Sequence, residues 1–333
     1  MVEGDRTSGA ASRDRSARPA ADDWGASAVT TAIVDRLQPG DHVCWAFHDD
    51  EERLRTTLRF VAGGITTGEK VLCLTEDPTP EALRAVLEAR GVDVTAAVAR
   101  GQVRFRDARG SSPDTGVFDP VSMLDDWRRE LGRARAEGYA SLRAITDMAW
   151  LARPVSVTGI RRLAWYEAQA NRMFADGYAT VVCLYDRRLF TAGDLRGIAS
   201  AHPGTAFTPG DESWRPQLRI LRTDDPLGLR LVGASDLSTR EALTAVLAGA
   251  AEDLPGCGAP LTVDVTGLTF ADAAAVHALV RTAQTASAGL RIVGASSLMA
   301  KLIHLAGGCD TRGMTVETTA DGPSPSTARE HTV

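Results

Sequence analysis

The 333-residue sequence has no long apolar run, few aromatic residues and no paired cysteines. No stretch approaches the roughly 20 apolar residues of a membrane-spanning helix, and the amino terminus lacks the apolar core of a secretory signal. The five cysteines are scattered and odd in number, which argues against a disulfide framework and favours reduced thiols. The net charge of −6 gives no general attraction to nucleic acid or anionic membranes. We therefore expect a soluble cytoplasmic protein with neither as a direct partner.

Helix-like and strand-like segments alternate from residue 29, the pattern of an α/β protein with a doubly wound sheet. Strands are predicted at 42–47, 70–75, 102–106, 141–146 and 178–185, and helices at 29–37, 49–64, 79–90, 120–134, 158–174 and 191–203. A second series has strands at 217–221, 227–233, 261–268, 290–294 and 314–317, and helices at 239–251, 271–287 and 297–306. These segments predict a first domain at 29–203 and a smaller α/β domain at 217–318. The proline- and glycine-rich stretch 204–216 is the predicted linker, and residues 1–28 and 319–333 have the composition of disordered tails.

The segment Gly63–Lys70 (GGITTGEK) superficially resembles a phosphate-binding loop, G-x-x-x-x-G-K-[ST]. It fails in composition, because Glu69 follows Gly68 and no Ser or Thr follows Lys70. It also lies between a predicted helix and the next strand, whereas a phosphate needs the amino terminus of the following helix. We interpret the segment as a helix end.

Two polar features fall where apolar residues are expected. His42 and Cys44 are two residues apart on a predicted strand and so project from the same face. Glu167 lies on the apolar seam of its predicted helix, one turn before Asn171. A buried carboxylate needs a partner such as an arginine, backbone donors or a ligand. A structural hydrogen-bond role and a ligand-contact role both remain open for these residues, and two candidate ligands are too few to predict a metal.

Acidic residues also follow the carboxyl ends of the predicted parallel strands, the edge at which open α/β sheets bind ligands. They include Glu76, Asp77, Asp147 and Asp186, with Trp150 as a candidate apolar wall. Any one acid of this kind is commonly a cap or turn residue; their convergence predicts a site. Cys73 and Cys183 lie in apolar strands and are interpreted as packing residues, and His202 as a helix-end residue.

Several stretches in order resemble the MEDS family, the sensory domain shared with the dichloromethane-dehalogenase repressor and methanogen signalling proteins. They are PGDHVCWAF, FVAGGITTGEKVLCL, GVFDP, GYASLRAITDMAW, YEAQAN and CLYDRRLF, spanning about 39–203. The resemblance implies a RecA/KaiC-like core that has lost its phosphate loop and senses small hydrocarbon-like molecules, with His42 and Cys44 as ligand contacts. Asp147 departs from the glutamate expected in many relatives.

The second domain, about 217–317, resembles the STAS domains of anti-sigma-factor antagonists through LTVDVTGLTFADAAAVHALV. In those antagonists a serine directly after the aspartate of F-x-D-S-S-G is phosphorylated. Here Asp272 is followed by Ala273 and Ala274, which have no hydroxyl, so that switch is chemically impossible.

Together these features predict a non-enzymatic signalling regulator. The first domain would sense a small molecule or a partner signal. Its candidate ligand-binding residues are His42, Cys44, Asp77, Asp147, Trp150, Glu167 and Asp186. The second domain would contact an anti-sigma-factor or kinase-type partner, and no cofactor or metal is expected. The alternative is an enzyme, a residual nucleotide hydrolase or small-molecule transferase that uses Glu167 or Asp147 as a base. A purely structural scaffold is a third possibility.

Overall fold

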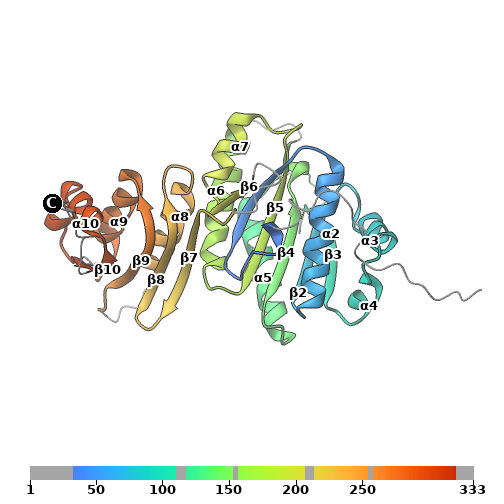
Figure 1. Ribbon diagram of the computed structural model, residues 1–333, viewed down its shortest axis with the longest axis horizontal. Coiled ribbons are helices and arrows are strands. Elements are labelled where there is room, and N and C mark those ends of the chain that lie inside the picture. The colour runs from blue at the N-terminus through green and yellow to red at the C-terminus, as the bar shows by residue number, and fades with distance from the viewer. Residues whose placement is uncertain (1–32, 110–117, 153–156, 207–213, 254–257, 320–333) are drawn as a thin grey trace, which may run out of the picture.

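The computed structural model describes residues 33–109, 118–152, 157–206, 214–253 and 258–319. Two domains lie side by side along the long axis of the molecule (Figure 1). The first contains β1 (His42–Phe47), α2 (Asp50–Thr66), β2 (Lys70–Thr75), α3 (Pro80–Ala89), α4 (Val94–Ala99), β3 (Val103–Asp107), α5 (Pro120–Ala136), β4 (Leu142–Asp147), α6 (Val157–Phe174), β5 (Ala179–Asp186), α7 (Ala192–Ala199) and β6 (Gly204–Ala206). The second contains β7 (Leu218–Asp224), β8 (Leu227–Ser235), α8 (Arg240–Glu252), β9 (Leu261–Ala271), α9 (Ala273–Thr285), β10 (Leu290–Ala295), α10 (Ser297–Leu305) and β11 (Met314–Thr318).

The first domain is built on a sheet of six strands in the order β3-β2-β4-β5-β1-β6. All of its pairings are parallel. One face packs against α2, α3 and α4, and the other against α5, α6 and α7, so that two apolar cores flank the sheet. The central strands are buried on both faces, as expected for a parallel sheet covered by helices.

Helices α2, α3, α5 and α7 of the first domain begin at side-chain caps. Asp49, Thr79 and Asp119 each accept a hydrogen bond from a backbone N–H in the first turn of α2, α3 and α5. Thr191 and Asp194 form a reciprocal capping box at α7. These local signals are why the helix starts match the expectations from the sequence to within about two residues.

The second domain has a five-stranded sheet in the order β11-β10-β9-β8-β7. Strands β7 and β8 form an antiparallel hairpin, and the remaining pairs are parallel. Helices α8, α9 and α10 contribute to one shared apolar core with this sheet. The predicted fold class, an α/β protein with a parallel sheet followed by a smaller α/β domain, is confirmed.

Several predicted boundaries differ from the structure. Helix α2 continues through Gly63 and Gly64 to Thr66, because the glycines let it pack closely on the sheet: a Cβ on Gly64 would lie 2.6 Å from Val71 Cγ2. Residues 204–206 belong to the first sheet as β6 and not to the predicted linker, since they pair with β1. The short helix α4 was not predicted. The helix predicted at 271–287 is α9, which begins at Ala273 and ends at Thr285.

The predicted tail 1–28 lies outside the described residues, as does all of 319–333 except residue 319. Among the helices that the structure describes, none combines the length and apolar character needed to cross a membrane.

Candidate functional site

The acids predicted at the sheet edge gather as expected, because β2, β4, β5 and β1 are neighbours that run in the same direction. Asp147 ends β4, and its carboxylate accepts a hydrogen bond from Arg53 of α2 at 2.7 Å and another from the Ala149 N–H at 2.9 Å. Asp186 ends β5 and is held by Arg188, whose Nε lies 2.9 Å from its Oδ1. Burial raises the pKa of Asp147 above its ordinary value, although the Arg53 guanidinium opposes the shift.

A pocket of about 150 Å³ adjoins this edge on the α2 and α3 side of the sheet. Its polar groups include Arg53 and Asp147, and its walls are mostly apolar. The wall includes Leu54, Cys73, Leu83, Val86, Ile145 and Leu184. A volume of this size accommodates a molecule of about six heavy atoms, since an apolar cavity of about 150 Å³ binds benzene.

Of the edge residues predicted for the site, Asp147 lines the pocket, whereas Asp77, Trp150 and Asp186 lie apart from its lining. Asp77 is exposed, and it is its backbone carbonyl that accepts from Arg53, at 2.5 Å. Trp150 lies in the 3-10 turn after β4 and packs edge-on against Phe118, with ring centroids 6.2 Å apart, within the core beside α5 and α6. Its indole Nε1 is buried, and no described residue forms a hydrogen bond with it.

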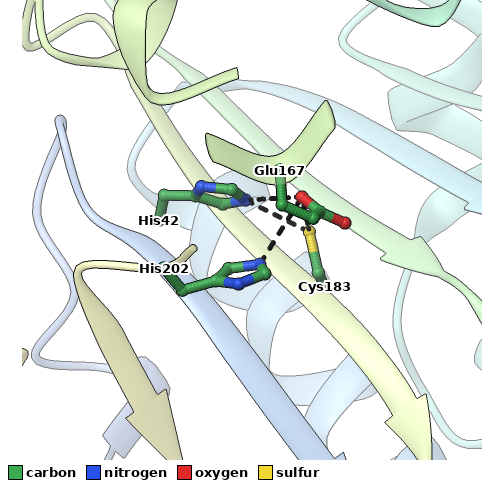
Figure 2. Close-up of side chains that lie close together, drawn as sticks. All are labelled: His42, Glu167, Cys183 and His202. Atoms are coloured by element: carbon green, nitrogen blue, oxygen red, sulfur yellow. Dashed lines mark hydrogen bonds and ion pairs between the residues drawn. The ribbon is translucent and has the colours of Figure 1, made fainter. Parts of the chain in front are cut away.

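A second group of polar side chains is buried on the opposite face of the sheet. Figure 2 shows His42, Glu167, Cys183 and His202 converging from β1, α6, β5 and the segment between α7 and β6. Glu167 Oε2 lies 3.4 Å from His42 Nε2, 3.5 Å from His202 Nε2 and 3.8 Å from Cys183 Sγ. His42 Nε2 lies 3.3 Å from Cys183 Sγ. All four residues are at most 2 % exposed.

Neighbouring groups orient this cluster. Asn171 Oδ1 lies 2.9 Å from His42 Nδ1, and the Asn171 amide nitrogen donates to three backbone carbonyls. His202 Nδ1 lies 3.0 Å from the carbonyl of Ile198, and the Tyr185 hydroxyl donates to Glu167 Oε1. Burial, reinforced by nearby His42, lowers the pKa of His202 to about 4. Burial and the Glu167 carboxylate raise the pKa of the Cys183 thiol well above its ordinary value.

The structure thus divides the predicted site into two groups. Asp147 and Asp186 lie at the sheet edge, and the other group lies on the opposite face of the sheet. His42 and Glu167 meet in the buried cluster, and Cys44 lies on the same face of β1, fully buried beside it, with its pKa raised by burial and by Glu167. The interpretation of Cys183 and His202 as only a packing and a helix-end residue was incomplete, because both also contact the other cluster members. Cys183 reaches the cluster because β5 pairs with β1, which sets Cys44 opposite Cys183. The sequence alone does not reveal which strands are neighbours in the sheet.

Helix α8 of the second domain packs on the first domain through small residues. Ala245 lies in a buried apolar cluster with Ala168 of α6 and Ala201. Gly249 underlies Arg172 of α6, where a Cβ would approach Arg172 Nε to 2.2 Å. Close backbone approach therefore brings α6 and α8 together.

Polar contacts extend this interface. The backbone N–H groups of Glu241 and Ala242, at the start of α8, donate to the Ser200 carbonyl at 3.1 and 3.2 Å. Arg219 of β7 forms a two-pronged ion pair with Asp41, with N–O distances of 2.7 and 2.9 Å. Asp41 is 2 % exposed and directly precedes His42.

The aspartate of the degenerate phosphorylation motif has a structural role. Asp272 caps α9 by accepting a hydrogen bond from the Ala275 N–H at 2.8 Å, and the helix begins at Ala273 and Ala274. Phe270, two residues earlier, is 55 % exposed. The end of β9 therefore presents an apolar side chain next to the position at which a phosphorylated serine would stand.

Fold and site define a two-domain α/β protein with a buried polar cluster and a small edge pocket in its first domain. Residues 41–203 match the family model described as MEDS, the methanogen/methylotroph DcmR sensory domain. Residues 218–310 match the family model described as Mlab, STAS domain. The chain therefore carries a MEDS domain followed by a STAS domain, as the sequence predicted. This pair of domains indicates a signalling or regulatory role.

No curated protein matches the chain. Among solved structures, a KaiC-like protein from Pyrococcus horikoshii is similar at 14 % identity and a TM-score of 0.38, covering 58 % of this chain and 78 % of its own. The flagellar accessory protein FlaH from Methanocaldococcus jannaschii is similar at 10 % identity and a TM-score of 0.38, covering 56 % of this chain and 87 % of its own.

Proposed function

We propose that the protein is a non-enzymatic regulator whose MEDS domain senses a small molecule and whose STAS domain passes the bound state to a protein partner. The observation that carries this proposal is the position of α6. One face of the helix supplies Glu167 and Asn171 to the buried cluster, and another packs Ala168 and Arg172 against α8. A change in the cluster therefore acts on an element that also bounds the STAS domain.

The ligand in this proposal binds the pocket at the sheet edge. Its apolar walls and the Arg53–Asp147 pair favour a small, mostly apolar molecule with one polar group. Strand β5 connects the pocket to the cluster: Leu184 lines the pocket, whereas its neighbours Cys183 and Tyr185 point to the other face and contact Glu167. Successive residues of a strand alternate between faces, so displacement of Leu184 also shifts these contacts.

The junction of β1 and α2 supports a function without nucleotide chemistry. In a parallel α/β sheet this junction is where a phosphate would meet a helix amino terminus. Here only His48 and Asp49 separate the two elements, and the first turn of α2 carries Asp50, Glu51 and Glu52. Carboxylates at this point repel a phosphate. Gly63–Lys70 lies at the carboxyl end of α2, as the sequence predicted.

Ligand binding can be tested on the full chain with a panel of short haloalkanes, alcohols and carboxylates, followed by thermal unfolding and ligand-observed NMR. Binding to the folded state alone raises the unfolding temperature by mass action. Val86→Phe, which fills the pocket, should abolish the shift, whereas Val121→Phe on the exposed face of α5 should leave it unchanged. Equal responses from the two variants would remove the pocket from the proposal.

The non-enzymatic part has its own test. Purified protein should show neither saturable ATP binding nor turnover of ATP or of any panel molecule that binds. Turnover that is lost in Asp147→Asn but retained in Asp272→Asn would favour the enzyme alternative. Partner binding is measured by recovering proteins on the immobilised chain with and without a binding panel molecule; a partner set that does not change with the ligand opposes sensing.

A further inference from the structure

The four side chains of the buried cluster have the spacing of a metal coordination shell. Zn²⁺ lies about 2.0–2.2 Å from nitrogen and oxygen ligands and about 2.3 Å from a thiolate. In a tetrahedron the ligand–ligand edge is about 1.6 times the metal–ligand distance, so neighbouring donors lie about 3.3–3.7 Å apart. Four pairs in the cluster lie 3.3, 3.4, 3.5 and 3.8 Å apart, and all four donor atoms are within 4.8 Å of one another.

The hydrogen bonds behind the two histidines direct their lone pairs into the cluster. The Asn171 nitrogen is committed to three carbonyls, so its oxygen faces His42 and the ring donates from Nδ1. The Ile198 carbonyl can only accept, so His202 also donates from Nδ1. In each neutral ring Nε2 is then an acceptor that faces Glu167. Metal-binding histidines typically donate their other ring N–H to a carbonyl or carboxylate that fixes the tautomer in this way.

The donors within the cluster are too few for its acceptors. His42 Nε2, His202 Nε2 and Glu167 Oε2 all need a donor or a cation, and the Cys183 thiol has one proton to give. His202 Nε2, on a fully buried side chain, has no hydrogen-bond partner among the residues that the structure describes. Burying such an atom unpaired is unfavourable. A cation between the four side chains would satisfy every acceptor at once.

We propose that His42, Glu167, Cys183 and His202 form a closed binding site for a divalent transition-metal ion, with Zn²⁺ the best match. The donor set of two imidazoles, one thiolate and one carboxylate in four-coordinate spacing favours zinc over the oxygen-preferring Mg²⁺ and Ca²⁺. Binding transfers the Cys183 thiol proton to solvent and forms the metal–sulfur bond. The dication with one thiolate and one carboxylate is then electrically neutral, as an apolar core requires.

The metal site goes beyond the proposed small-molecule sensing, and it lies on the opposite face of the sheet from the edge pocket. Four protein ligands leave no open position for a substrate, so the ion holds structure instead of performing chemistry. Three of the four ligands belong to segments that also touch the STAS domain: His42 follows Asp41, Glu167 precedes Ala168, and His202 follows Ala201. A bound metal ion would therefore hold in place the surface of the first domain against which α8 packs.

The test uses the full chain, reduced and freed of metal, and incubated with Co²⁺ or Zn²⁺ both in the native state and during refolding from urea. One equivalent of Co²⁺ should give the intense visible bands of a tetrahedral site and a near-ultraviolet thiolate charge-transfer band, with about one proton released. Zn²⁺ should displace it. His202→Gln should weaken binding at least 100-fold, and Cys183→Ser should remove the charge-transfer band. Asn171→Leu, which acts through His42, should weaken binding about 10–100-fold.

Two control variants test whether a cysteine other than Cys183 binds the metal ion. Cys309→Ser removes the exposed thiol that lies 3.1 Å from His304 Nδ1 and is the obvious adventitious site, and Cys44→Ser changes a buried cysteine outside the four-residue group. Both should retain stoichiometric binding. Absence of one-equivalent binding by the wild type under both loading conditions overturns the proposal. So does binding that is lost in Cys309→Ser but retained in His202→Gln.

Discussion

The Asp41–Arg219 ion pair joins the domains beside the buried cluster, and its removal is a sharp test of their coupling. Arg219→Met keeps an apolar side chain at this position. Among the described residues it leaves the Asp41 carboxylate, which is 2 % exposed, with the Gln38 N–H as its one remaining donor. Breaking a buried pair by removing one partner costs about 3–5 kcal/mol. Because Arg219 itself is 23 % exposed, we expect the low end of that range, about 3 kcal/mol.

The assay is urea unfolding followed by tryptophan fluorescence. All six tryptophans lie at or before residue 214, so fluorescence reports the MEDS domain although the substitution is in the STAS domain. The matched control is Arg230→Met on the adjacent strand, where the Arg230–Asp264 pair is exposed and worth about 0–1 kcal/mol. Asp41→Asn should recover part of the loss in Arg219→Met. If both arginine variants left the fluorescence transition unchanged, the reasoning about this interface would be wrong.

Three further predictions follow from single sites. Gly64→Ala should lower the free energy of unfolding by about 1–3 kcal/mol, because the added Cβ would clash with Val71. Gly132 is exposed on α5 with open space around it, so Gly132→Ala should raise the free energy of unfolding by about 0.5–1 kcal/mol. Thermal and urea unfolding measure both changes. Burial raises the pKa of Asp147, so ionisation of this carboxyl group destabilises the folded wild-type protein. The free energy of unfolding of Asp147→Asn relative to wild type should therefore increase as the pH rises from about 4 to 7. A decrease would contradict the assignment. Site-resolved alkylation of native protein should modify exposed Cys309 much faster than Cys73, whose pKa burial raises to about 12; equal rates would show that the core opens readily.

Most of the fold follows from local patterns. Buried strands such as Lys70–Thr75 are continuous apolar runs between turn signals, and helices such as α5 and α7 begin at recognisable caps. Strand β6 escaped prediction because Gly204 follows a proline and signals a turn; it forms a strand because β1 offers it a free edge. Helix α4 is only six residues long, too short for a clear periodic pattern.

The site was only partly predictable. Glu167 was conspicuous because a carboxylate on an apolar seam needs a partner, and the sequence could not name that partner. His42 and Cys183 are 141 positions apart, and they meet only because β1 and β5 are adjacent in the sheet. His202 has no local signal beyond its place at a helix end. The edge acids were predictable together, since the direction of parallel strands alone places them on one side.

The most direct test of communication between the domains is hydrogen–deuterium exchange in Tyr185→Phe, which removes the hydroxyl bonded to Glu167 and nothing else from the cluster. We expect faster exchange of the α8 amides, Arg240–Glu252, while those of α9, which lies beyond α8, keep their wild-type rates. Unchanged exchange in α8, or equal acceleration in α8 and α9, would contradict it.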